Sequence, residues 1–112
     1  MINEHKFGSF VISGRSYLGD IKIIDGKVHY WEDRKKHTVN FDDVNDLLES
    51  GPEVIIVGTG NSGYLEMPAE IKDIILGRRI KLFVDVNVNA VKKYNEAVSM
   101  GGKVAALFHA TC

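Results

Sequence analysis

The sequence predicts a single α/β domain built around a mixed β-sheet, and three observations lead to this class. The chain has 112 residues, of which 45% are apolar and 26% are charged, as is typical of one globular domain. The first half contains a strong β-hairpin signal. The second half alternates β-prone runs with helical patterns in the order strand, helix, strand, helix, strand. Such alternation favours a partly parallel sheet, and the N-terminal hairpin makes the whole sheet mixed.

The first elements are expected to be antiparallel strands. An opening strand is indicated by the apolar side chains of Phe7, Phe10 and Val11. Two β-prone runs, Ile21–Ile24 and Val28–Trp31, follow and are separated by Asp25-Gly26. The Asp-Gly pair favours a type I′ turn, because both central residues of that turn need a positive φ. The charged stretch 32–37 is expected as a solvated loop or hairpin tip, and Thr38-Val39 as a short returning strand.

A first helix is predicted to begin near Asn40. Asn40 can cap this helix, and Asp42 and Asp43 lie in its first turn, where the helix dipole favours acidic side chains. Four apolar residues share one face of the helix: Phe41, Val44, Leu47 and Leu48. The helix is expected to end at Gly51-Pro52.

Three buried strands and two helices are predicted for the second half. The strands are the runs 54–57, 80–84 and 103–108. The first of them is continuously apolar, which is typical of a strand covered on both faces. Pro68 is expected to be the first residue of a helix with an apolar stripe at Ile71, Ile74 and Ile75. Asn87 is expected to cap the last helix. Its apolar face has helical spacing and consists of Ala90, Val91, Tyr94, Ala97 and Val98.

Composition argues against several classes of function. The formal net charge is −1, so no overall positive field directs the chain to nucleic acid or to a membrane surface. The longest apolar run is too short to span a bilayer, and the first residues lack the apolar core of a signal peptide, so a cytoplasmic location is expected. The single cysteine, Cys112, excludes an internal disulfide framework. The four histidines show no metal-ligand spacing, so we predict no metal site and no cofactor.

The loop Gly58–Gly63 matches the pattern G-x-G-x-x-G directly after a strand, and Asp85 ends the next strand. This arrangement is similar to the fingerprint of dinucleotide-binding folds. Pro68 argues against that function, because a helix that starts there begins too late to direct its N-terminus at a pyrophosphate. Two interpretations remain: a tight turn at the end of a strand, or a nest of N–H groups for an anion or small ligand.

Two other places combine residues that could do chemistry. His109 and Cys112 lie near the C-terminal end, where an irregular backbone would allow the histidine to activate the thiol. A buried cysteine and a hydrogen-bonded histidine are the favoured interpretation. Tyr94 is explained by packing, whereas Asn95 lies next to the apolar face and needs hydrogen-bond partners if it is buried.

Four segments together resemble a known family: 53–60, 90–95, 102–107 and 109–112. The likeness runs from about Phe7 to Cys112. The family comprises small single-domain proteins of archaea, bacteria and eukaryotes, first seen in the structure of a methanogen hypothetical protein. An adipogenesis-associated protein and a mitochondrial complex I assembly factor are among its eukaryotic relatives. The resemblance implies a three-layer α/β fold with a central mixed sheet, whose last strand is antiparallel to its neighbours. It implies no established enzyme activity.

The resemblance also implies which residues carry the family's features. A Gly-Thr-Gly turn falls on Gly58, Thr59 and Gly60, a Tyr-Asn pair on Tyr94 and Asn95, and a His-x-Thr-Cys ending on His109, Thr111 and Cys112. Many relatives have threonine where this chain has Asn87, and both residues can cap a helix. The assembly role belongs to a mitochondrial branch with added targeting sequence, so we do not carry it across.

The leading functional hypothesis is a soluble, non-catalytic binding or assembly module for a protein partner or small ligand. Its expected site is the cleft at the carboxyl ends of the parallel strands. The candidate lining residues are Gly58, Thr59, Gly60, Asn61, Ser62, Gly63, Asp85, Asn87, Tyr94, Asn95, His109, Thr111 and Cys112. The alternative is an enzyme for a small anionic or nucleotide-like substrate, with His109 as acid or base. A homo-oligomer with its function at the interface is a third hypothesis.

Overall fold

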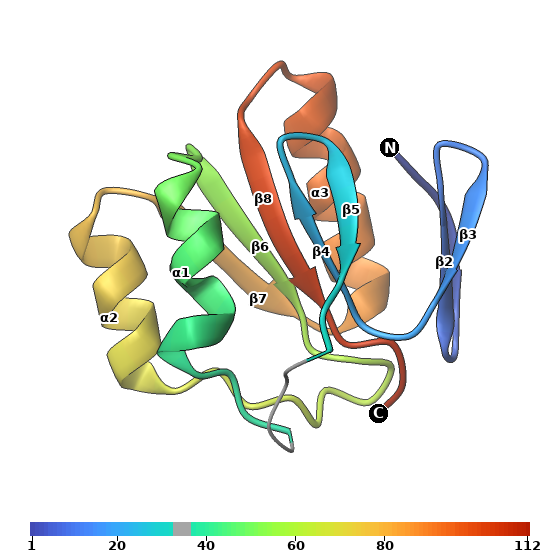
Figure 1. The fold of residues 1–112 in the computed structure, drawn as a ribbon, viewed down its shortest axis with the longest axis horizontal. Coiled ribbons are helices and arrows are strands. Elements are labelled where there is room, and N and C mark those ends of the chain that lie inside the picture. The colour runs from blue at the N-terminus through green and yellow to red at the C-terminus, as the bar shows by residue number, and fades with distance from the viewer. Residues whose placement is uncertain (33–36) are drawn as a thin grey trace.

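The computed structural model describes residues 1–32 and 37–112, which form one α/β domain of three layers (Figure 1). The elements in chain order are β1 (Ile2–Lys6), β2 (Ser9–Ile12), β3 (Arg15–Leu18), β4 (Ile21–Ile24), β5 (Lys27–Tyr30), α1 (Phe41–Glu49), β6 (Val54–Gly58), α2 (Ala69–Gly77), β7 (Lys81–Asp85), α3 (Asn87–Ser99) and β8 (Val104–Phe108). None of the described helices has the length and apolar character needed to cross a bilayer.

The central sheet has five strands in the order β5-β4-β8-β6-β7. It is mixed, as predicted, because β6 is parallel to β7 and β8 whereas β4 is antiparallel to β8. The expectation that the last strand is antiparallel to its neighbours is therefore wrong for one of them. The helix α3 connects β7 to β8, and a helical crossover of this kind joins strands that run in the same direction.

Side-chain alternation along the central strands divides the core into two layers. In β6, Ile55 and Val57 pack toward α1 and α2, whereas Ile56 packs toward α3. In β8, Leu107 belongs to the first layer and Phe108 to the second. Figure 1 shows the same arrangement, with α1 and α2 on one face of the sheet and α3 on the other. Strands buried on both faces explain the continuous apolar runs of the sequence.

The N-terminal residues form a second, three-stranded antiparallel sheet in the order β1-β2-β3. The predicted opening strand is confirmed at Phe10 and Val11, which lie in β2, whereas β1 and β3 were not predicted. Ser13 and Gly14 have φ angles of 50° and 80° in the turn between β2 and β3, so Ser-Gly forms a tight turn that the sequence reasoning overlooked. Phe7 lies in another turn and is exposed. Phe10 is fully buried, with its ring centroid 5.4 Å from that of Phe108, so this sheet covers part of the α3-side core.

The predicted central hairpin is confirmed as β4 and β5. Asp25 and Gly26 have φ angles of 52° and 75°, as the proposed turn requires. The predicted strand at Thr38-Val39 is wrong, because Thr38 makes only an isolated bridge to Glu66 before α1 begins. The predicted charged loop falls largely on residues 33–36, which lie outside the described residues.

The three predicted helices are confirmed, with changes at two of their starts. The main-chain N–H of Asn40 donates to the Asp43 carboxylate at 2.8 Å, and Asn40 is the N-cap of α1 as predicted. Pro68 is the N-cap of α2 rather than its first residue, because its ψ of 146° is extended. Val86 is the N-cap of α3, so Asn87 lies inside the helix, and its side chain is used elsewhere.

Two apolar residues assigned to buried helix faces are partly exposed. Phe41 in α1 is 39% exposed and Ile74 in α2 is 37% exposed. Both helices pack on the sheet with one side only, and these residues lie at the edge of the buried stripe.

Candidate functional site

The glycine loop after β6 is bound to the C-terminal residues of the chain. The main-chain N–H of Asn61 donates to the Thr111 oxygen at 2.7 Å. The N–H groups of Ser62 and Tyr64 both donate to the main-chain oxygen of Cys112, at 3.1 and 3.0 Å. The donors of the predicted anion nest are therefore engaged by the chain itself. An anion reaches these N–H groups only by displacing the C-terminal residues.

Glycine is required at two loop positions because other parts of the chain approach closely. A Cβ on Gly60, which has a φ of +102°, would lie 2.7 Å from the Cys112 oxygen and 3.0 Å from His109 Cδ2. A Cβ on Gly58 would lie 2.5 Å from the Asn87 side-chain oxygen. The distances of 2.7 and 2.5 Å to these oxygens are shorter than real Cβ contacts allow. Close packing against the C-terminal segment thus accounts for the glycine pattern without a dinucleotide.

Asn87 fastens the glycine loop to the end of β8. Its fully buried amide accepts a hydrogen bond from the Gly60 N–H at 3.1 Å and donates to the His109 main-chain oxygen at 2.7 Å. Asp85 has a local role, since its carboxylate accepts hydrogen bonds from the Val86 N–H at 2.7 Å and from Asn89 Nδ2 at 3.1 Å. Both residues therefore organise the start of α3.

Two other loop residues, Thr59 and Gly63, support the loop from within. Thr59 is buried, its N–H donates to the Asp85 oxygen at 2.9 Å, and its own oxygen accepts from the Leu65 N–H. Gly63 has a φ of +78°, and a Cβ there would lie 3.2 Å from Val86 Cγ1. The loop is therefore a packed turn, in which the residues Asn61, Ser62 and Tyr64 are exposed.

Tyr94 and Asn95 lie away from the glycine loop, contrary to the sequence prediction. Each lies about two turns along α3 from Asn87, or roughly 12 Å at 1.5 Å per residue. Tyr94 is buried against Phe108, and this burial raises its pKa. The Asn95 amide makes two 2.8 Å bonds with the main chain of Ile2, so it anchors β1 to α3.

His109 is held at the end of β8 by a carboxylate. Its Nδ1 lies 3.0 Å from Asp20 Oδ1, which also accepts the Ala110 N–H at 2.7 Å. Its Nε2 lies 3.5 Å from the Thr111 hydroxyl. The imidazole is 1% exposed, and the Asp20 side chain is 13% exposed. The ring orientation of His109 is thus fixed by a buried pairing that joins the β3–β4 connection to the C-terminal segment.

The same region collects side chains that are far apart in the sequence. His37 lies edge-on to His109, with ring centroids 5.4 Å apart. One potential ligand atom from each of His37, His109 and Cys112 lies within 4.8 Å of the others. The sequence shows no metal-ligand spacing, because His37 comes from the connection between β5 and α1 and only the fold brings it beside His109 and Cys112.

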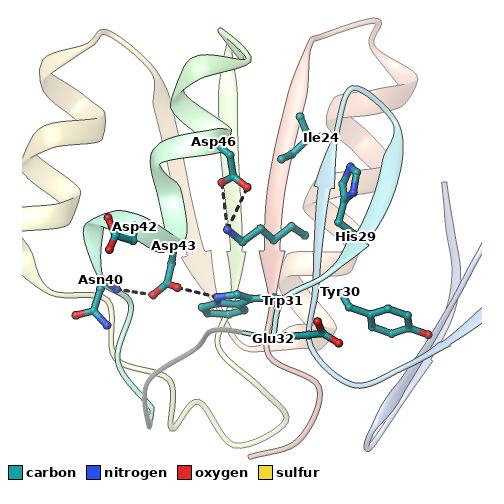
Figure 2. Close-up of a pocket in the computed structure, with 10 residues that line it drawn as sticks. Ile24, His29, Tyr30, Trp31, Glu32, Asn40, Asp42, Asp43 and Asp46 are labelled. Atoms are coloured by element: carbon teal, nitrogen blue, oxygen red, sulfur yellow. Dashed lines mark hydrogen bonds and ion pairs between the residues drawn. The ribbon is translucent and has the colours of Figure 1, made fainter.

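A separate hollow in the described part of the chain lies between the β4–β5 hairpin and the start of α1 (Figure 2). Its volume is about 590 Å³. Its lining residues are Lys22, Ile24, His29, Tyr30, Trp31, Glu32, Asn40, Asp42, Asp43 and Asp46. Four of these carry carboxylates and one is a lysine, so the described lining is strongly acidic. We call this feature the acidic hollow.

Two interactions fix the walls of the acidic hollow, as Figure 2 shows. The Trp31 indole N–H donates to Asp43 Oδ1 at 2.9 Å, and both side chains are buried. The Lys22 ammonium lies 3.1 Å from Asp46 Oδ1 and 3.2 Å from Oδ2. Lys22 is only 9% exposed, so its charge is partly removed from water and paired.

The sequence reasoning identified none of the acidic hollow as a site. One signal was the pair Asp42 and Asp43, which the sequence analysis explains by the first turn of a helix, where acids are common. The alternation of β4 carried a second signal. Lys22 interrupts an apolar run, and a charged residue facing a helix needs a partner such as Asp46.

Comparison with known proteins agrees with the resemblance seen in the sequence. A family model described as a protein of unknown function (DUF498/DUF598) matches residues 2–109. The solved structure of a protein called MT938 is 33% identical, covers 100% of this chain and 98% of its own, and superimposes with a TM-score of 0.84. A structure described as an outer membrane protein from Bartonella henselae is 25% identical, with 99% and 94% coverage and a TM-score of 0.84. The conserved hypothetical protein PH1505 from Pyrococcus horikoshii OT3 is 23% identical, with 100% and 99% coverage and a TM-score of 0.83.

Proposed function

The chain belongs to the DUF498/DUF598 family of proteins of unknown function, and we propose that it is a non-catalytic binding module whose acidic hollow docks a basic segment of a partner protein. The charge of the hollow is the observation that carries this proposal. The described lining has four carboxylates and one lysine, which gives a formal charge of one minus four, or −3. A volume of about 590 Å³ lies in the range of roughly 300–1,000 Å³ that is common for binding pockets.

The carboxylates of the acidic hollow fall into two pairs. Asp43 and Asp46 are bonded to Trp31 and Lys22, so they hold the shape of the wall. Glu32 and Asp42 are exposed and add negative charge to the lining, one after β5 and the other in the first turn of α1. An arginine or lysine of a partner can pair with these two carboxylates while its aliphatic stem packs on the apolar lining. Arginine suits such a site best, because its planar fork can bond to a carboxylate through two donors.

Isothermal titration calorimetry tests this proposal with a capped peptide of alternating arginine and glycine. A peptide with glutamate in place of arginine is the matched control. We expect the arginine peptide alone to bind. The double variant Glu32→Gln, Asp42→Asn removes two exposed charges worth about 0.2–1 kcal/mol each, so affinity falls about two- to thirtyfold. The control variant Asp73→Asn removes an exposed carboxylate of α2 and leaves binding unchanged.

Two results would overturn the docking proposal: equal binding of both peptides, or wild-type affinity in the double variant. The titration is repeated on a chain with Arg34, Lys35 and Lys36 changed to glutamine. These residues follow Glu32 closely in the sequence, and their replacement makes the net charge of the chain more negative by three. Tighter peptide binding in that variant would support the assignment.

An anion beside the Gly58–Gly63 loop, as predicted from the sequence, requires displacement of the C-terminal segment. The loop donors that bond to Thr111 and Cys112 would have to exchange these oxygens for the anion. Inorganic phosphate is a direct probe. If the loop binds phosphate, two changes should appear at the same phosphate concentration: the NMR resonances of the loop amides shift, and hydrogen exchange of the C-terminal amides becomes faster.

One observation favours a second candidate, an enzyme for a small anionic substrate. The pairing of His109 with Asp20 at 3.0 Å is the arrangement that orients histidines for acid–base catalysis. Burial weighs against it, because the imidazole is 1% exposed and a substrate must reach it. Turnover of p-nitrophenyl phosphate that disappears in His109→Gln would support this candidate. No turnover in the wild type would count against it.

A cytoplasmic location and self-association stay predictions. Cell fractionation with an antibody tests the first. Native mass spectrometry beside the denatured mass tests the second, and it also detects any small molecule that leaves on denaturation.

A further inference from the structure

We propose that His37, His109 and Cys112 form a binding site for a zinc ion or a chemically similar transition metal. One potential ligand atom from each residue lies within 4.8 Å of the others. Imidazole nitrogen and cysteine thiolate are both donors that zinc uses, and its sites with three protein ligands keep a fourth position open for water. This site is separate from the acidic hollow, and the inference does not rest on the proposed docking function.

Three parts of the chain fix the positions of the donors. His109 follows β8, and Cys112 lies three residues farther on, where its main-chain oxygen is held by the glycine loop. His37 lies between β5 and α1, and its main-chain oxygen accepts the Glu66 N–H at 2.6 Å. Main-chain hydrogen bonds therefore anchor the backbone at Cys112 and at His37. Only the side chains of His37 and Cys112 need to adjust when a metal binds.

The surroundings of His109 match those of a metal-binding histidine. Such residues commonly bond one ring nitrogen to a carboxylate, which orients the ring and makes the other nitrogen the ligand. Here the Asp20 carboxylate lies 3.0 Å from Nδ1, and the Ala110 N–H at 2.7 Å holds the same carboxylate oxygen. Asp20 is thus a positioning residue that would direct Nε2 to the metal.

The nitrogen and sulfur donors favour zinc over the harder cations, which prefer oxygen ligands, and the bond lengths of zinc fit the cluster. Zinc bonds of about 2.0–2.1 Å to nitrogen and 2.3 Å to sulfur place tetrahedral ligand atoms roughly 3.3–3.6 Å apart. Closing the cluster from 4.8 Å requires movements of about 1 Å, which the exposed His37 and half-buried Cys112 side chains can make. Binding releases the thiol proton to solvent. The thiolate offsets one of the two positive charges of zinc, and water can take the fourth position.

Titration of the reduced full chain with Co²⁺ tests the site, because tetrahedral cobalt has visible absorption bands and a thiolate ligand adds a charge-transfer band. We expect one cobalt ion per chain, both kinds of band, and loss of the bands when Zn²⁺ is added. Cys112→Ser is expected to lose the charge-transfer band. His37→Ala and Asp20→Asn are expected to weaken binding at least tenfold. His5→Ala removes a histidine outside both the cluster and the acidic hollow and should leave affinity and spectra unchanged.

Circular dichroism verifies that each variant is folded, which is expected for His37→Ala because His37 is exposed. A folded wild-type chain without the cobalt bands would overturn the proposal. So would an unchanged charge-transfer band in Cys112→Ser, or wild-type affinity in His37→Ala. One metal per two chains, lost on dilution, would also overturn it, because that result shows a site made by two thiols from different copies.

Discussion

Replacing Asn87 with alanine is expected to destabilise the fold by about 2–5 kcal/mol. The Asn87 amide is fully buried and bonds the Gly60 N–H at 3.1 Å and the His109 oxygen at 2.7 Å. Alanine would leave both main-chain groups buried without these partners, at a cost of about 1–3 kcal/mol each. The better helix propensity of alanine returns about 0.5 kcal/mol. The net loss is a large part of a total stability of about 5–15 kcal/mol.

Asn95 provides a matched control on the same helix. Its amide also makes two bonds to main-chain atoms, both of 2.8 Å and both to Ile2. Asn95 is half-buried, so water can replace the lost amide in Asn95→Ala. The expected loss is therefore only about 1 kcal/mol. The two substitutions remove the same atoms from the same helix, and they differ mainly in how deeply the asparagine side chain is buried.

Urea unfolding measures both losses, with far-UV circular dichroism and the fluorescence of Trp31 as independent probes. Coincident transitions and equal m-values show that the free energies can be compared. If Asn87→Ala costs no more than Asn95→Ala under these conditions, the reasoning from burial is refuted. That result would also reject the conclusion that Asn87 stabilises the glycine loop through its two hydrogen bonds.

Three more predictions concern other parts of the molecule. Gly60→Ala forces a side chain against Cys112 at a φ of +102°, so we expect a loss of about 1–3 kcal/mol and faster hydrogen exchange in the glycine loop. Burial raises the pKa of Tyr94, so above pH 10 the unfolded chain loses a proton that the folded chain keeps. The free energy of unfolding should therefore fall as pH rises past 10, by at most about 1.4 kcal/mol per pH unit from this group. Urea unfolding at a series of pH values should show that the free energy of unfolding falls less steeply with pH in Tyr94→Phe. Lys22→Met removes the cation that pairs with Asp46, so calorimetry should show about two- to fivefold tighter binding of the arginine peptide.

Much of the fold is visible in the sequence because local signals agree with the tertiary structure. Asp25-Gly26 specified its hairpin, since few residue pairs adopt two positive φ angles in succession. The apolar run that became β6 indicated a strand covered on both faces, and Ile55 and Ile56 do pack into opposite layers. Ser13-Gly14 gave a weaker signal for the same kind of turn, so the second sheet was missed.

The candidate sites were harder to predict because they depend on contacts between distant parts of the chain. Nothing in the spacing of His37 and Cys112 shows that both lie beside His109. The glycine pattern is visible in the sequence, but the sequence does not show that the C-terminal segment occupies the N–H groups of the glycine loop. The acidic hollow arises where α1 leaves part of the β4–β5 hairpin uncovered, and only the packed structure defines that gap.

Chemical-shift mapping on the ¹⁵N-labelled chain, titrated with the arginine peptide, tests the docking function most directly. The function predicts that shifts concentrate on the lining of the acidic hollow, including the Trp31 indole N–H that donates to Asp43. It also predicts that the chemical shifts of the α2 amides, which lie on the far side of α1 from the hairpin, do not change. Shifts confined to the Gly58–Gly63 loop, or no shifts at a peptide concentration that calorimetry shows to be saturating, would contradict it.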